Sequence, residues 1–203
     1  MSGRARELRK AQQSDWERRE RRRRWIVAGA WIGAGVAVVA MIVYLAWKQA
    51  QPTPRTGEDI PVVSAEHIPL GQPHAPYNSN PPTSGPHYAK PEQAGFYDVA
   101  PADEALVHNL EHGFFIIWYN CSALSDGECS RLKSQIKDVM QSAGVSTITG
   151  TPKLIAVPRT AMDTRLALTT WGRLDTFDAF DRQRILNFIK VFRDQAPEPN
   201  ADA

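Results

Sequence analysis

The sequence predicts an α+β domain in which helices pack against a small sheet, joined to one N-terminal transmembrane helix. Two observations predict this architecture: an uncharged apolar run covers residues 25–47, and apolar residues beyond residue 102 follow alternating helix and strand periods. Eleven of the fifteen prolines lie between Pro52 and Pro101. Because proline disfavours helix interiors and central strands, we expect a Pro-rich loop region before the regular elements.

The charge of the chain is divided unevenly along its length. Residues 1–24 carry ten Lys/Arg against four Asp/Glu, whereas residues 48–203 carry fourteen against eighteen, so the net charge of +2 conceals a basic tail. The arginine run at 21–24 alone is compatible with nucleic-acid binding. The apolar segment that follows it instead predicts a cytoplasmic tail beside a membrane, with the lipid bilayer as a partner and no nucleic acid.

The segment from Ile26 to Ala46 contains 21 residues without charge. At about 1.5 Å per residue, this length crosses a hydrocarbon core of about 30 Å. The basic residues before the segment predict a cytoplasmic N-terminus and an extracytoplasmic C-terminal domain in the cell membrane. A cleaved signal peptide is the alternative, but its apolar region would be shorter, about 7–15 residues. We therefore predict an uncleaved single-pass anchor at residues 25–47.

The remaining chain divides into a linker, one domain and a short tail. Residues 48–59 are polar with two prolines, which predicts a semi-extended linker. Residues 60–197 have the length of a single domain that can close a core. Residues 198–203 are predicted to be a tail.

Regular elements follow one another from residue 102 onward. A helix is expected from Ala102 through His112, since acids occupy its first turn and Gly113 suits its C-terminal cap. The other expected elements are strands at 114–119, 153–157 and 165–171, a helix with Leu132, Ile136, Val139 and Met140 on one face, and a last helix starting at Phe180. A thioredoxin-like arrangement, which also ends strand, strand, helix, is the alternative topology. The Cys-x-x-Cys motif of that family is absent.

Cys121 and Cys129 lie on either side of the predicted turn at 125–127. In an extracytoplasmic domain, two cysteines in this arrangement predict a disulfide that closes a short loop. Thiolate ligation of copper or zinc, or a redox pair, are the alternatives.

All five histidines fall between residues 67 and 112, and this clustering predicts a metal site. His108 and His112 are four residues apart and share one face of the expected helix. His87 on a stiff loop is the expected third ligand, and His67 a fourth. Copper and zinc both suit imidazole. The alternative is a structural or interaction module, bound to a membrane or exported protein, in which the histidines only pack.

The sequence His108-Asn109-Leu110-Glu111-His112 also satisfies the H-x-x-E-H motif of zinc hydrolases, with the glutamate as general base. Because the helix stops at Gly113 and the acids of the last helix are aspartates, hydrolysis is only a third hypothesis, and we assign no catalytic residue. Glu111 is otherwise expected to be a solvated or helix-orienting carboxylate. Thr83 or Ser84 is a candidate nucleophile, but a rigid turn explains both hydroxyls better.

Several motifs resemble a family of bacterial membrane-anchored proteins known only as a domain of unknown function. The motifs are Pro81-Pro82-Thr83-Ser84-Gly85-Pro86-His87-Tyr88, Gly95-Phe96-Tyr97, the segment from Ala105 to Gly113 that contains His-Asn-Leu-Glu-His-Gly, and Leu168-Thr169-Thr170-Trp171-Gly172-Arg173. The resemblance covers roughly residues 60–195. His67 with Gly71 resembles the family's His-x-x-x-Gly opening, whereas His74 does not match. The resemblance implies an exported domain without an assigned activity.

Overall fold

The structure is a computed structural model that describes residues 3–50 and 55–202. It divides the chain into two compact units at the junction of Pro52 and Thr53, and each unit is described by itself. Residues 51–54 of the predicted linker and residue 203 of the predicted tail lie outside the described residues.

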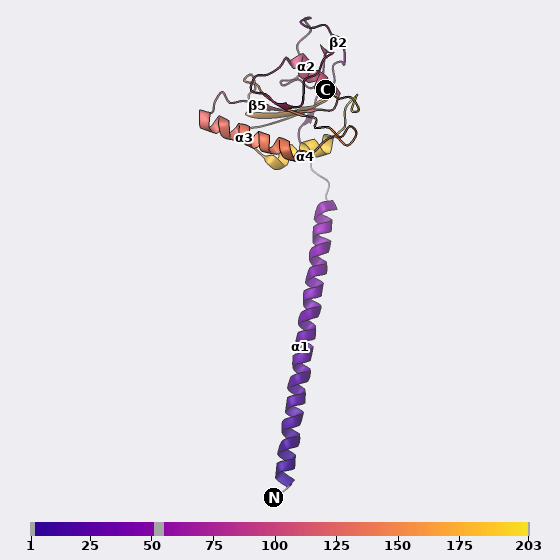
Figure 1. Cartoon of the computed structure of the whole chain (residues 1–203), viewed down its shortest axis with the longest axis vertical. Coiled ribbons are helices and arrows are strands. Elements are labelled where there is room, and N and C mark those ends of the chain that lie inside the picture. Colours follow the sequence, from indigo (N-terminus) through magenta and orange to yellow (C-terminus); the bar gives the residue numbers. More distant parts are fainter. Residues whose placement is uncertain (1–2, 51–54, 203) are drawn as a thin grey trace. The chain divides into compact units, whose positions relative to one another are not determined.

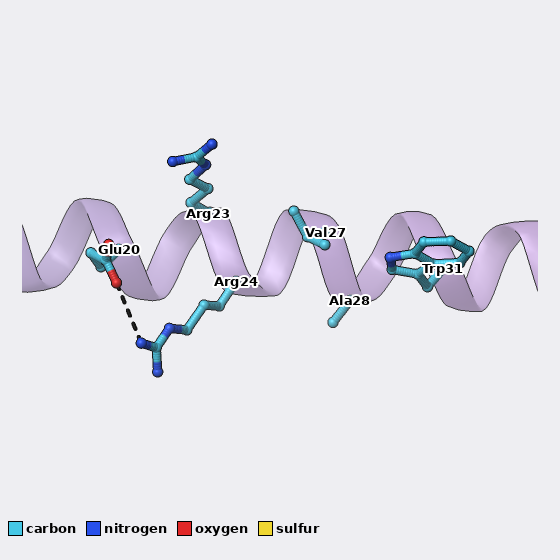
Figure 2. Close-up of a pocket in the computed structure, with 6 residues that line it drawn as sticks. All are labelled: Glu20, Arg23, Arg24, Val27, Ala28 and Trp31. Carbon is cyan, nitrogen blue, oxygen red and sulfur yellow. Dashed lines mark hydrogen bonds and ion pairs between the residues drawn. The ribbon is translucent and has the colours of Figure 1, made fainter.

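The N-terminal unit contains a single long helix, α1 (Gly3–Ala50), drawn in indigo and purple in Figure 1. Its segment Arg18–Lys48 is long and apolar enough to cross a membrane, a property that a signal sequence shares. The basic tail continues this helix, which was not predicted. The tail is rich in Arg, Glu, Ala and Gln, which favour helix. Figure 2 shows Arg24 reaching back one turn to Glu20, at 3.4 Å, while Arg23 points to another side.

The C-terminal unit is built on a six-stranded mixed sheet with the order β1-β8-β7-β5-β6-β4. Strand β5 is parallel to β6 on one side and antiparallel to β7 on the other, and β8 is antiparallel to β7. The strands are β1 (Glu58–Asp59), β4 (Gly95–Phe96), β5 (Phe115–Tyr119), β6 (Leu154–Pro158), β7 (Leu166–Thr170) and β8 (Arg173–Phe177). This sheet with its helices confirms the predicted α+β class.

The connectivity places helix α3 (Asp126–Ser142) between β5 and β6, and helix α4 (Arg182–Phe192) after β8. With the order β8-β7-β5-β6, this connectivity resembles the thioredoxin-like arrangement that the sequence left as the alternative, but no helix lies in the described residues between β6 and β7. Strand β8 was not predicted. It forms a hairpin with β7 through Trp171 and Gly172, and Gly172 has a positive φ of 66°, which glycine adopts without steric cost. Strand β1 lies within the predicted linker and pairs with β8.

Strand β5 separates two apolar layers because its side chains alternate between the faces of the sheet. Phe115, Ile117 and Tyr119 pack with α3 and α4 on one face, whereas Ile116 and Trp118 face the layer of helix α2 (Asp103–Glu111). Figure 1 shows α3 and α4 together on one side of the sheet and α2 on the other. The continuous apolar run of this strand is therefore buried on both faces, as predicted.

Local signals define where the helices begin. Ser125 and Glu128 form a reciprocal capping box at the start of α3, and the Asp181 carboxylate accepts a hydrogen bond from the Arg184 backbone N–H at the start of α4. Cys121 follows β5 and Cys129 lies in the first turns of α3, with their sulfurs 2.12 Å apart. The two cysteines therefore lie at disulfide distance.

The described part of the proline-rich stretch, residues 55–101, contains only short strands, as expected. Besides β1 and β4, it holds β2 (His67–Ile68) and β3 (His87–Tyr88), which pair in parallel as a separate two-stranded sheet. This small sheet and helix α2 carry the residues of the candidate site.

Candidate metal centre

The register of the small sheet brings two predicted ligands together. His67 pairs directly with His87 across β2 and β3, although the two residues are twenty positions apart in the chain. Their ring centroids are 4.7 Å apart in an edge-to-face arrangement. Strand pairing therefore positions both imidazoles at one place, which no helical spacing in the sequence indicates.

Helix α2 supplies the remaining groups from its last turn. His108 and Glu111 are three residues apart, so their side chains project from neighbouring positions on one face. The His108 ring stacks on His67 with a centroid distance of 4.9 Å and lies 5.2 Å from the His87 ring. The face of α2 that carries His108 and Glu111 thus packs against the small sheet.

These four residues form what we call the His/Glu cluster: His67, His87, His108 and Glu111. One donor atom from each lies within 4.8 Å of all the others. The Glu111 Oε2 atom is 2.9 Å from His87 Nε2 and 3.6 Å from His67 Nε2. His67 alone of the four is exposed, with 48% of its side chain accessible, so the cluster opens to solvent on the His67 side.

Hydrogen bonds to the backbone fix the orientation of two imidazoles. The Nδ1 atom of His87 donates to the Gly85 carbonyl at 2.8 Å, and the Nδ1 atom of His108 donates to the Tyr88 carbonyl at 2.6 Å. A carbonyl oxygen only accepts, so Nδ1 must carry the proton in both rings. In the neutral form each ring then presents an Nε2 lone pair. Metal-ligating histidines are oriented by backbone partners in the same way.

With the proton on Nδ1, the His87 ring faces Glu111 with an acceptor atom, and the carboxylate oxygen of Glu111 is also an acceptor. The His87 Nε2 lone pair meets a carboxylate oxygen of Glu111 at 2.9 Å, and the contact is favourable only with a proton or a cation between the atoms. Tetrahedral coordination at about 2.0–2.1 Å separates neighbouring ligand atoms by about 3.3 Å. The distances of 2.9 and 3.6 Å on either side of Glu111 bracket that value. The residues present could therefore hold a metal ion.

His112 lies at the edge of the cluster. Its Nε2 atom is 2.9 Å from His108 Nε2, and its Nδ1 atom donates to the Asp202 carbonyl at 3.1 Å. Burial lowers the pKa of both His108 and His112 below the usual histidine value, because desolvation disfavours the imidazolium. Both rings are consequently biased toward the neutral form that binds metals.

The structure brings some of the predicted site residues together and places others apart. It brings His67, His87 and His108 together and leaves His112 outside the four-residue group, while His74 is turned to Glu104 at 3.2 Å. Glu111 differs most from expectation, since it is only 4% exposed rather than solvated. The available signal was its position three residues after His108 on the same helix.

Two other motifs, H-x-x-E-H and the Thr83/Ser84 hydroxyls, are candidate catalytic groups in the sequence. In the H-x-x-E-H motif, the carboxylate of Glu111 contacts His67 and His87, whereas His108 and His112 contact each other. Ser84 is fully buried, and its hydroxyl accepts a hydrogen bond from the Val63 backbone N–H at 3.2 Å. This contact suits a rigid turn.

Comparison with known proteins gives a family and no activity. Residues 68–203 match the model of a family described as "Protein of unknown function (DUF3105)". No curated protein and no solved structure is detectably similar to the chain. The matched segment covers the small sheet from Ile68, helix α2 and the whole of the central sheet except β1. The chain therefore belongs to the DUF3105 family of proteins of unknown function.

Proposed function

We propose that the domain binds one transition-metal ion, copper or zinc, through the His/Glu cluster. The observation that carries the proposal is the convergence of three imidazoles and one carboxylate within 4.8 Å from three separate elements. His87 and His108 are held with Nε2 available, and Glu111 supplies negative charge in a buried position. Imidazole suits both zinc and copper, and a carboxylate is common in zinc sites.

The ligand set proposed here differs from the set predicted from the sequence. Glu111 takes a ligand position, and His112 becomes a neighbour of the ligand His108 at 2.9 Å. The exposed side of the cluster at His67 gives an exogenous ligand a route to the ion. The arrangement suits binding and exchange of an ion with the surroundings.

We further propose that α1 anchors the domain in the cell membrane, with the N-terminus in the cytoplasm. The support is the length of the apolar segment and the arginines before it. An impermeant protease added to intact cells should degrade the domain, whereas protease added to inverted vesicles should reach only the basic tail. Protection of the domain in intact cells would contradict this orientation.

The metal proposal is tested with the full chain, purified without an affinity tag in detergent. Isothermal titration with Zn(II) and Cu(II) should give one ion per chain for the wild type. His67→Gln should weaken binding by more than about 100-fold, because even an outer partner of a ligand is worth about 10–100-fold. His74→Gln is the matched control and should bind as the wild type does.

The competing function is an interaction module in which the histidines only join loop to helix. It predicts no saturable binding to the wild type and equal melting temperatures with and without chelator. That result would end the metal proposal.

A further inference from the structure

The last described residues of the chain lie against the His/Glu cluster. We call residues 198–202 the C-terminal strap. The Glu198 backbone N–H donates to the Glu111 carbonyl at 3.0 Å, and the Asp202 carbonyl accepts from His112 Nδ1. Pro199 also lies beside Gly113, because a Cβ atom built on Gly113 would be in ordinary van der Waals contact with the Pro199 Cα at 3.8 Å. The strap is therefore joined to the end of α2 at several points.

A buried lysine fixes the strap in this place. Lys153 is 5% exposed, and its ammonium donates to the carbonyls of His112, Pro199 and Ala201 at 2.7–2.8 Å. Two of these carbonyls belong to the strap and the third to the C-terminus of α2, where the helix dipole favours a cation. Because the ammonium has three protons, all its donors are used.

The strap places a carboxylate beside the cluster. Glu198 Oε2 is 3.7 Å from His112 Nε2, which in turn is 2.9 Å from His108 Nε2. The Glu198 side chain is 55% exposed, whereas His112 and His108 are buried. These three side chains form an unbroken series of metal-binding atoms from the solvent to a ligand of the cluster.

We propose that Glu198 and His112, the access pair, capture a transition-metal ion from solution and pass it to His108 in the cluster. This inference rests on the proposed metal binding and adds the route and the residues that control it. An ion at the access pair exchanges water for one carboxylate oxygen and one imidazole nitrogen. It then reaches the cluster by moving from His112 Nε2 to His108 Nε2 without crossing an apolar layer.

The geometry favours transfer over permanent ligation by the access pair. His112 lies outside the group of donor atoms that share a 4.8 Å radius, so an ion centred in the cluster has its ligands without it. Glu198 is exposed and keeps much of its hydration, which makes an ion held there exchangeable. A transient site on the path speeds both binding and release and leaves the equilibrium unchanged.

The access pair is tested by measuring the rates of Zn(II) binding and release by the full chain in detergent. The rates are measured by stopped flow, and a chromophoric chelator that competes for Zn(II) reports the reaction. The variant is Glu198→Gln, which keeps the backbone contact of residue 198 to Glu111 and removes the charge. Asp138→Asn is the control, since this exposed residue lies on α3 on the opposite face of the sheet. Both variants change the net charge equally.

We expect Glu198→Gln to slow Zn(II) association and dissociation by the same factor, at least about 10-fold, with Kd within about twofold of the wild type. Asp138→Asn should leave both rates unchanged. Unchanged rates in Glu198→Gln would mean that ions enter past the exposed His67, and faster dissociation with a weaker Kd would make Glu198 a ligand. Either result overturns the access pair, while failure of the wild type to bind Zn(II) would overturn the metal proposal itself.

Discussion

Glu111 Oε2 lies 2.9 Å from His87 Nε2, and both side chains are buried between helix α2 and strand β3. The Nδ1 proton of His87 is already donated to the Gly85 carbonyl, so the facing nitrogen has only a lone pair in the neutral ring. A carboxylate has no proton to offer when ionised. The contact therefore requires a proton or a cation between the two atoms, and an ion in the cluster would supply the cation.

Replacement of Glu111 by glutamine separates metal binding from folding. The amide N–H₂ group of glutamine can donate to His87 Nε2 and keep the contact without a cation. We expect Glu111→Gln to bind Zn(II) more than about 100-fold more weakly, while its melting temperature in chelator equals or exceeds that of the wild type. Calorimetry and thermal unfolding measure the two effects. A large loss of stability in chelator would show that the carboxylate serves the fold.

Stability in the presence of chelator should decrease as the pH falls below about 6.5. Burial lowers the folded-state pKa of His108 and His112, so the unfolded chain takes up protons in this range that the folded chain does not. Asp194 also has a lowered pKa, through hydrogen bonds from Ser146 and Thr147, but its effect begins only below about pH 4. Urea unfolding from about pH 8 to about pH 5 isolates the histidine effect. A flat profile over that range would contradict it.

Lys153→Met should destabilise the domain and release the C-terminal strap. Methionine leaves the buried His112 carbonyl and two part-buried strap carbonyls without their donor, and an unsatisfied buried acceptor costs about 1–3 kcal/mol. Lys133→Met is the matched control, because the Lys133–Asp98 pair is exposed to solvent and contributes little to stability. Urea unfolding and proteolysis near residue 198 measure both consequences. Equal losses in the two variants would refute the role of Lys153.

The cysteine pair should be oxidised in protein isolated from the membrane. Cys121 and Cys129 lie at disulfide distance, and no Lys or Arg separates them, so one tryptic peptide contains both. Its mass without reductant should be lower than the reduced mass by that of two hydrogen atoms. Alkylation of both thiols in native protein would contradict the disulfide.

The regular half of the fold could be predicted from periodicity, because α2, β5 and α4 each bury one clear apolar pattern. Strand β8 could not be found in this way, since its two apolar residues, Leu174 and Phe177, are three positions apart and do not follow a strand period. Asp175 between them is a charged residue in a buried position. Arg184 from α4 forms an ion pair with that aspartate at 2.6 Å. This ion pair joins β8 to α4, and such a tertiary contact cannot be predicted from the local sequence.

Only some of the ligands of the candidate site could be predicted, because the others are brought together by tertiary contacts that leave no local sequence pattern. His108 was found because helical spacing relates it to its neighbours, and His87 because a stiff motif surrounds it. The meeting of His67 with His87 depends on the register of two-residue strands, which the sequence does not encode locally. The burial of Glu111 depends on the sheet that covers it, and the strap held by Lys153 joins residues about fifty positions apart.

The small sheet formed by β2 and β3 has only two residue pairs, so its backbone ladder contributes little cohesion to the proline-rich half of the domain. An ion shared by β2, β3 and α2 would clamp three distant segments together. At a free concentration 100 times the Kd, ligand binding stabilises a fold by about 2.7 kcal/mol. The supply of metal would then govern how quickly proteases degrade this protein, and so set its lifetime.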